Sequence, residues 1–255
     1  MLVPTMTPGE IRDDIIKDID LLVDYIFRFQ KHITNFARLP IRKFPFFQSK
    51  KIISKKTNKT YELVIYAPNK YRQKTPSFFI YTKYSHQWGT TYVEILPNDG
   101  KFEYRIYTPH FIKRYHERMR LDDTISMNDA FIRFRVNNMA TGRLDDFIID
   151  NTEKYYHDKD TEYYANIIPE GACICERDVT EPDVIIHNTF ISREMFFATQ
   201  EKKAKFYLIS TIWKAFLMNY PRQKEALVRE FDKMVTEAEN ENVLLEKVSQ
   251  FVDTY

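Results

Sequence analysis

A strand that leads directly into a capped helix is the feature of this sequence that most constrains its fold. Apolar and polar residues alternate over 102–106, which is the period of a half-buried β-strand. Thr108 follows as a helix N-cap and Pro109 as the first helical residue, so the pattern predicts a short helix over 109–119. The sequence therefore predicts a strand–helix junction near the middle of the chain.

Three side chains of this predicted helix have groups that can bind phosphate or transfer protons. His110, Arg114 and Arg118 are spaced at i, i+4 and i+8, which places them along one face at about 6 Å per step. A titratable imidazole beside two permanent cations is suited to holding a phosphate group and moving a proton near it. The alternative is that both arginines are solvated or ion-paired surface residues and that His110 is an ordinary first-turn histidine.

The segments around the junction predict an α+β protein. Helical spacing of Ile, Leu, Val and Phe over 11–33 predicts one long N-terminal helix that ends before Pro40. Alternating patterns then predict antiparallel strands on both sides of the motif helix, and the residues after 193 predict a helical C-terminal segment. The expected strands cover 51–54, 61–66, 78–83, 91–96, 163–168, 172–177 and 184–191. Three parts are expected, over 1–100, 101–200 and 201–255.

The segment from Arg38 to Thr90 is strongly basic. It contains twelve Lys or Arg residues and one acid, Glu62, so it carries a net charge of +11. Aromatic residues, Trp88 among them, are interleaved with these charges, and the combination is suited to single-stranded or looped nucleic acid. The alternative is an ordinary antiparallel sheet with a lysine-rich outer face. The nucleic-acid-binding candidates are Lys50, Lys51, Lys55, Lys56, Arg72 and Lys83.

An acidic run follows later in the chain. Between Asp145 and Glu162 there are seven acids and two lysines, a net charge of −5. The run lacks a clean apolar period, which predicts a loop or insertion. It could cover the basic segment when no substrate is bound, although a solvated acidic loop is the commoner arrangement.

Other classes of site find little support in the sequence. Cys173 and Cys175 lie two apart in a predicted strand, where they share a face and cannot easily bridge, so we expect two reduced thiols and a cytoplasmic protein. We expect no membrane segment, no metal and no cofactor. The sequence has no glycine-rich nucleotide loop, no H-E-x-x-H metal motif and no G-x-S-x-G elbow.

The motif helix and the strands after it resemble a known family. The residues Thr108-Pro109-His110-Phe111-Ile112-Lys113-Arg114-Tyr115-His116-Glu117-Arg118, followed by a helix and a strand meander, resemble the toxin-type ribonucleases of the RelE-like and colicin-like (BECR) superfamily. The resemblance covers about 104–191. It implies a helical part packed on a four-stranded antiparallel sheet. It also implies that His110 is the motif histidine, that Arg114 and Arg118 are the motif arginines, and that Thr189 is the late polar residue.

Together these features predict a metal-independent endoribonuclease. In such an enzyme a ribose 2′-hydroxyl attacks the adjacent phosphate while one group accepts a proton, another protonates the leaving oxygen and cations stabilise the phosphorane. His110 would be the acid or base, and Arg114 and Arg118 the clamp. His187 or Thr189, which at i, i+2 would share one face of a strand, would supply the second proton carrier or a phosphate contact.

A binding module without turnover is the competing prediction. It would be a nucleic-acid- or protein-binding accessory protein of a mobile genetic element, with an antitoxin-like or oligomeric partner docking on its helices. The third alternative is a structural protein that assembles through its C-terminal helices. A catalytic site requires His110, Arg114 and Thr189 to converge within about 6 to 8 Å in a cleft, whereas a binding surface does not.

Overall fold

The computed structural model describes residues 6–98, 101–138, 142–144 and 161–254 of this 255-residue chain. The nine strands in these ranges form one sheet, in the spatial order β1-β2-β3-β4-β5-β9-β8-β7-β6. Their bounds are β1 Phe46–Ile53, β2 Thr60–Ala67, β3 Ser77–His86, β4 Gly89–Asn98, β5 Lys101–Tyr107, β6 Gly142–Leu144, β7 Thr161–Ile168, β8 Gly171–Asp178 and β9 Val184–Ser192. The expectation of an α+β protein is confirmed.

The sheet is mixed, which corrects the expectation of antiparallel strands alone. All neighbouring pairs are antiparallel except β5 and β9, which run parallel with Tyr104 beside Val184. The connection between them contains α4 (Pro109–Arg118) and α5 (Met127–Asn137), which cross one face of the sheet, and then β6, β7 and β8. A parallel pair requires a long crossover of this kind. The predicted meander is confirmed as β7, β8 and β9. It belongs to the same sheet as β1 to β5, which it continues beyond β5.

Three helices replace the long N-terminal helix that the periodicity predicted. They are α1 (Pro8–Ile16), α2 (Ile19–Arg28) and α3 (Gln30–Ala37). The break between α1 and α2 lies at Asp18, whose carboxylate accepts hydrogen bonds from Ser54 Oγ at 2.6 Å, Tyr61 Oη at 2.8 Å and Thr57 Oγ1. These donors belong to the β1–β2 hairpin. A tertiary contact therefore interrupts a pattern that is locally suited to one helix.

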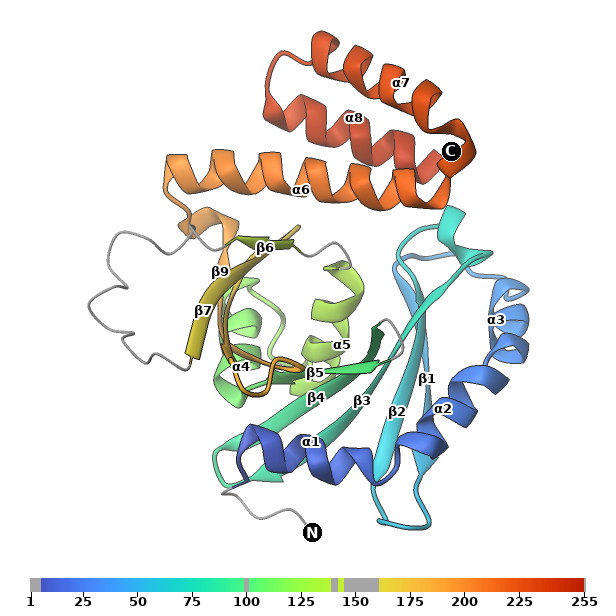
Figure 1. Ribbon diagram of the computed structural model, residues 1–255, viewed down its shortest axis with the longest axis vertical. Coiled ribbons are helices and arrows are strands. Elements are labelled where there is room, and N and C mark those ends of the chain that lie inside the picture. The colour runs from blue at the N-terminus through green and yellow to red at the C-terminus, as the bar shows by residue number, and fades with distance from the viewer. Residues whose placement is uncertain (1–5, 99–100, 139–141, 145–160, 255) are drawn as a thin grey trace.

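The helices cover both faces of the curved sheet (Figure 1). α4 and α5 lie inside the curve, where they share an apolar core with strands from both halves of the sheet, including Phe79 of β3 and Phe190 of β9. α1, α2 and α3 lie outside it and bury Ile15, Leu22 and Phe36 against β1 to β5. The motif helix α4 is therefore held at the centre of the fold.

An aromatic cluster fixes the inner helices. The Phe131 ring of α5 stacks on Tyr92 with centroids 4.6 Å apart and meets Tyr81 and Tyr107 at 4.9 and 5.2 Å. The Phe131 side chain is fully buried, and replacing such a ring by alanine costs about 3–5 kcal/mol. This packing holds α5, and α4 beside it, in one position on the sheet.

The C-terminal helical segment is confirmed as a bundle of three helices, α6 (Ala198–Asn219), α7 (Lys224–Glu237) and α8 (Glu241–Thr254). Trp213 lies in its core, stacked on Phe231 at 4.8 Å. Ala204 and Leu208 of α6 also pack on the outer face of β7 and β8. Short 3-10 turns cover Tyr71–Gln73, Arg193–Met195 and Pro221–Gln223.

One expectation falls largely outside the described residues. It is the predicted acidic loop, of which only Thr161 and Glu162, the first residues of β7, are described. Within the described part of the chain, no helix combines the length and the apolar character needed to cross a membrane.

Candidate functional site

The strand–helix junction folds as the sequence predicts. Thr108 has an extended backbone, and its Oγ1 accepts a hydrogen bond from the Phe111 amide at 3.1 Å. The same hydroxyl lies 3.3 Å from the carbonyl oxygens of His187 and Asn188, so the cap also joins α4 to β9. Phe111, Ile112, Tyr115 and His116 form the buried face of α4. Because the helix repeats every 3.6 residues, His110, Arg114 and Arg118 fall outside that face.

We call the line of His110, Arg114 and Arg118 the α4 stripe. His110 is exposed, and Arg114 keeps 44% of its side chain accessible to solvent. Arg114 Nη1 lies 3.2 Å from Glu117 Oε2, and Lys113 Nζ lies 3.9 Å from the other oxygen of the same carboxylate. Two cations therefore share one exposed acid, and such surface pairs contribute little net stability.

Arg118 is the fixed member of the stripe. Its Nη1 donates to the backbone carbonyl of Phe190 in β9, which anchors the guanidinium to the sheet. Burial and the neighbouring Arg114 lower the pKa of Arg118, while Glu117 partly opposes them. An anion bound beside Arg114 and Arg118 would relieve the repulsion between the two guanidiniums.

His187 does not join the stripe, because it is buried at 3% exposure beneath α4. Its ring stacks on Tyr107 with centroids 4.3 Å apart, and Nδ1 lies 3.3 Å from Cys175 Sγ. Burial, followed by the nearby Arg105 and Arg135, lowers the pKa of His187 well below its usual value. A neutral imidazole enclosed in this way cannot exchange protons with a phosphate bound outside.

Thr189 lies on the other face of the sheet, which corrects the expectation that it shares a face with His187. Opposite β8 the strand β9 contains a bulge: His187 pairs with Cys175, whereas Thr189 pairs with Ile174. Because neighbouring positions of β8 point to opposite faces, the additional residue Asn188 reverses the alternation. Thr189 therefore points away from the α4 side, and the five predicted catalytic residues do not converge on one cleft.

Cys173 and Cys175 are free and buried, as predicted for reduced thiols. Burial raises the pKa of Cys175 to about 12, so the sulfur beside His187 is a neutral thiol. A thiolate is needed for nucleophilic attack, and the Cys175 thiol is neutral. The pair of Cys175 and His187 is therefore part of the core and not a nucleophilic site.

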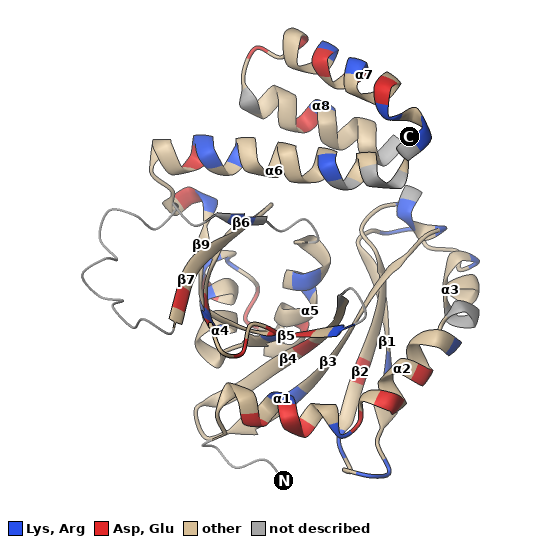
Figure 2. Ribbon diagram, viewed as in Figure 1, with Lys and Arg blue, Asp and Glu red and all other residues tan. Residues whose placement is uncertain are grey.

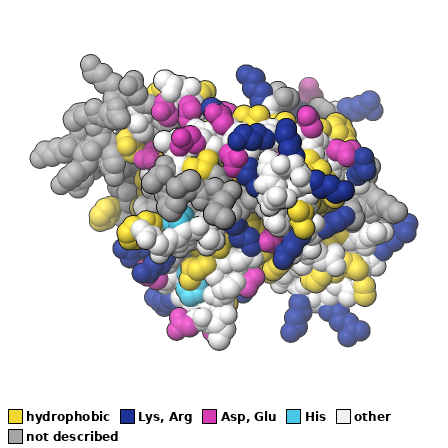
Figure 3. Space-filling view, turned by 90° about the horizontal axis from the view of Figure 1, so that it is seen from below, with side chains coloured by type: hydrophobic (Ala, Val, Ile, Leu, Met, Phe, Trp, Pro, Cys, Tyr) yellow, Lys and Arg dark blue, Asp and Glu magenta, His cyan; other side chains and the backbone are white. Residues whose placement is uncertain are grey.

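The predicted basic candidates are divided between different parts of the surface. Lys50 lies over the Tyr25 ring of α2 on the outer face, whereas Lys51 pairs with Glu62 in the register of β1 and β2 and points to the inner face. Lys83 binds Glu62 at 2.6 Å. Lys55 and Lys56 are exposed in the β1–β2 turn, and Arg72 is half-buried in a 3-10 turn. In Figure 3 the Lys and Arg side chains are correspondingly spread out and interrupted by other types.

This chain matches no known family model, curated protein or solved structure. In the residues that the structure describes, no group of three or more His, Cys, Asp or Glu side chains is placed to hold a metal ion.

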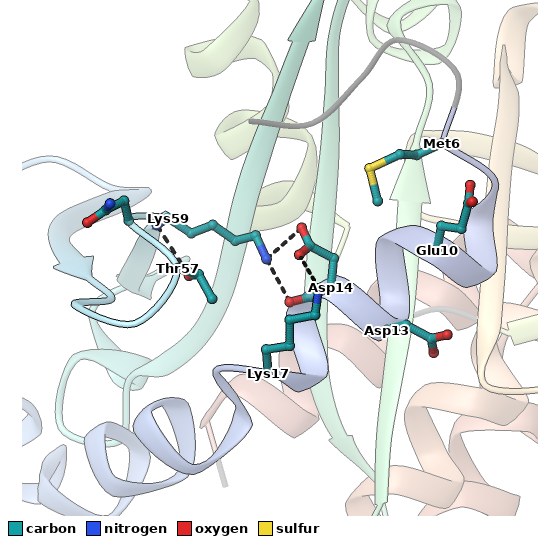
Figure 4. Close-up of a pocket in the computed structure, with 8 residues that line it drawn as sticks. Met6, Glu10, Asp13, Asp14, Lys17, Thr57 and Lys59 are labelled. Carbon is teal, nitrogen blue, oxygen red and sulfur yellow. Dashed lines mark hydrogen bonds and ion pairs between the residues drawn. The ribbon is translucent and has the colours of Figure 1, made fainter.

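A cavity of about 710 Å³ lies between α1 and the β1–β2 turn (Figure 4). Lys59 Nζ reaches across it to Asp14, 2.6 Å from the carboxylate and 2.6 Å from the backbone carbonyl, and Lys17 lies 3.2 Å from the same carboxylate. Figure 2 shows the acids of α1 and α2 close to the basic β1–β2 turn. These charges neutralise one another and hold α1 against the hairpin, so the cavity is a weaker candidate than the α4 stripe.

Glu117 is the member of the site that sequence reasoning missed. It stands three residues after Arg114 and four after Lys113, the spacings at which helical side chains meet. That spacing was sufficient to predict both ion pairs. The separation of His187 from Thr189 had no such signal, because a β-bulge depends on how neighbouring strands pair.

Proposed function

We propose that this protein binds RNA through the α4 stripe. The observation that carries the proposal is the alignment of His110, Arg114 and Arg118 along one side of α4 that lies outside its buried face, from exposed His110 to half-buried Arg118. Guanidinium groups match phosphate oxygens in charge and geometry, and an anchored guanidinium such as that of Arg118 loses less freedom on binding. With His uncharged, α4 carries three cations and one acid over 109–118, which favours a polyanion.

Binding is favoured over cleavage because only one proton carrier of the predicted pair belongs to the stripe. Cleavage through a ribose 2′-hydroxyl requires an acid and a base on opposite sides of the phosphate. His187 is enclosed in the core, and Thr189 points to the opposite face. His110 remains exposed next to the arginines, and this observation keeps metal-independent endoribonuclease activity as the second candidate.

One experiment separates the two functions. The purified protein is incubated with a mixed RNA pool in EDTA, and retention on a filter and the RNA fragment pattern are both recorded. Retention that falls as salt rises, with intact RNA, supports the binding function. Fragments that disappear with His110→Ala would support the ribonuclease instead. Absence of both signals would overturn the proposal.

A further inference from the structure

The tip of the β3–β4 hairpin is packed against the start of the motif helix. His86 pairs with Gly89, so Gln87 and Trp88 form a two-residue turn. A Cβ atom added to Gly89 would lie 3.0 Å from Pro109 Cβ, and Gly89 adopts a positive φ of 126°. Glycine is needed at this position for both reasons. The contact places the hairpin tip beside the first turn of α4.

Trp88 is presented at this tip with 74% of its surface exposed. Cross-strand contacts brace the hairpin below it: His86 Nε2 lies 3.1 Å from Thr91 Oγ1, and Ser85 Oγ lies 3.3 Å from Thr90 Oγ1. A large ring held out on a braced turn retains its apolar faces for a ligand, and its two side-chain torsions limit the entropy lost on binding.

The chain places this ring at one end of the α4 stripe. Trp88 directly precedes Gly89, and His110 directly follows Pro109, so each is the chain neighbour of a residue in the hairpin–helix contact. From His110 the stripe continues for two more turns to Arg118, about 12 Å along the helix axis. The hairpin–helix contact thus brings the turn that carries an exposed aromatic ring to the start of a row of cations, and single-stranded nucleic acid requires both kinds of group.

We propose that Trp88 stacks on an unpaired base of single-stranded RNA whose phosphates lie along the α4 stripe. This inference rests on the RNA-binding function proposed above and names the substrate class of that site. In a duplex the bases are already stacked on their neighbours and their faces are covered, so this site discriminates against double-stranded RNA. Because every base has a flat π-face, the contact tolerates any sequence.

Tryptophan fluorescence tests the stacking directly. The chain has two tryptophans, and the other, Trp213, is 5% exposed in the C-terminal bundle. Titration of the 255-residue chain with a 12-nucleotide oligo(U) RNA should quench the Trp88 emission, and Trp88→Ala should remove the quenching. We expect Trp88→Ala to weaken binding about tenfold, Trp88→Phe to restore most of it, and a matched duplex to bind more weakly than the single strand.

Phe27→Ala is the matched control, because Phe27 is an aromatic residue of α2 with 77% exposure on the other side of the sheet. Circular dichroism checks that each variant is folded. Salt-sensitive binding of oligo(U) without quenching, and with equal affinities for the parent and Trp88→Ala, would overturn the stacking and leave the RNA-binding function intact. Equal binding of single strand and duplex would also overturn it. Failure of the parent to bind any RNA would overturn both proposals.

Discussion

The motif helix α4 and the β1–β2 hairpin are both rich in basic residues, but the fold uses their charges differently. On α4 the helical repeat collects His110, Arg114 and Arg118 along one side, where His110 is exposed and both arginines are partly exposed. On the hairpin, consecutive lysines point to opposite faces of the sheet. In the hairpin turn, the ammonium groups of Lys56 and Lys59 donate to backbone carbonyls in the C-cap and the last turn of α1, at 3.0 and 2.6 Å. A high local charge count therefore does not predict a basic surface, whereas the spacing of the charges does.

The largest effect that this comparison predicts is a loss of stability when the contacts between Asp18 and the β1–β2 hairpin are removed. Asp18→Asn should lower the free energy of unfolding by about 2–3 kcal/mol, because the three hydroxyl donors of Ser54, Thr57 and Tyr61 lose their charged acceptor. RNA affinity should not change. Urea unfolding followed by circular dichroism measures the loss, and Asp20→Asn on the exposed side of α2 is the matched control. Equal stability of the two variants would show that the hydrogen bonds between Asp18 and the hairpin do not stabilise the fold.

The Asp18 contribution should also depend on pH. Burial by itself would raise the pKa of Asp18, but the hydrogen bonds from Ser54, Thr57 and Tyr61 outweigh it, so the pKa lies below the usual 3.8. A carboxylate with a lowered pKa contributes its stability fully above the unfolded value and loses it as pH falls through the folded value. The difference in stability between the parent and Asp18→Asn should be constant from pH 7 to about 5 and shrink below pH 3.8.

The next effect falls on α4. Arg114→Glu should weaken RNA binding about tenfold, since it removes a charge-assisted phosphate contact and adds a repulsive charge. It should also lower the slope of log affinity against log salt by about 0.7. Fluorescence anisotropy at four salt concentrations measures both quantities. Arg229→Glu on α7 changes the net charge equally and is the control. If the two variants bind equally well, the protein is responding to its total charge and the α4 stripe is not a site.

The smallest effect is expected for the strand lysines. Lys50→Gln and Lys51→Gln should each change RNA affinity by less than about twofold, because these side chains lie on opposite faces of β1 and cannot contact one strand of RNA together. The same anisotropy assay compares them with Arg114→Glu. A loss as large as that of Arg114→Glu would move the RNA-binding surface from α4 to the hairpin.

Local spacing was enough to predict several elements of this fold. Four features could be predicted from the sequence because each depends on neighbouring residues. They are the strand over 101–107, the Thr108 cap, the start of α4 at Pro109 and the meander after residue 160. The stripe on α4 follows from the helical repeat in the same way. These predictions needed no knowledge of what packs against each element.

Tertiary contacts decided the rest. The periodicity over 11–33 is correct for one helix, but the hydroxyl groups around Asp18 stabilise a break that no local signal marks. The parallel pairing of β5 with β9 brings together residues eighty positions apart, and the bulge at Asn188 separates Thr189 from His187. The sequence by itself determined which side chains lie along α4. Only the folded chain determined that His187 is enclosed beneath that helix and that Trp88 stands beside it, because burial and proximity depend on contacts between distant segments.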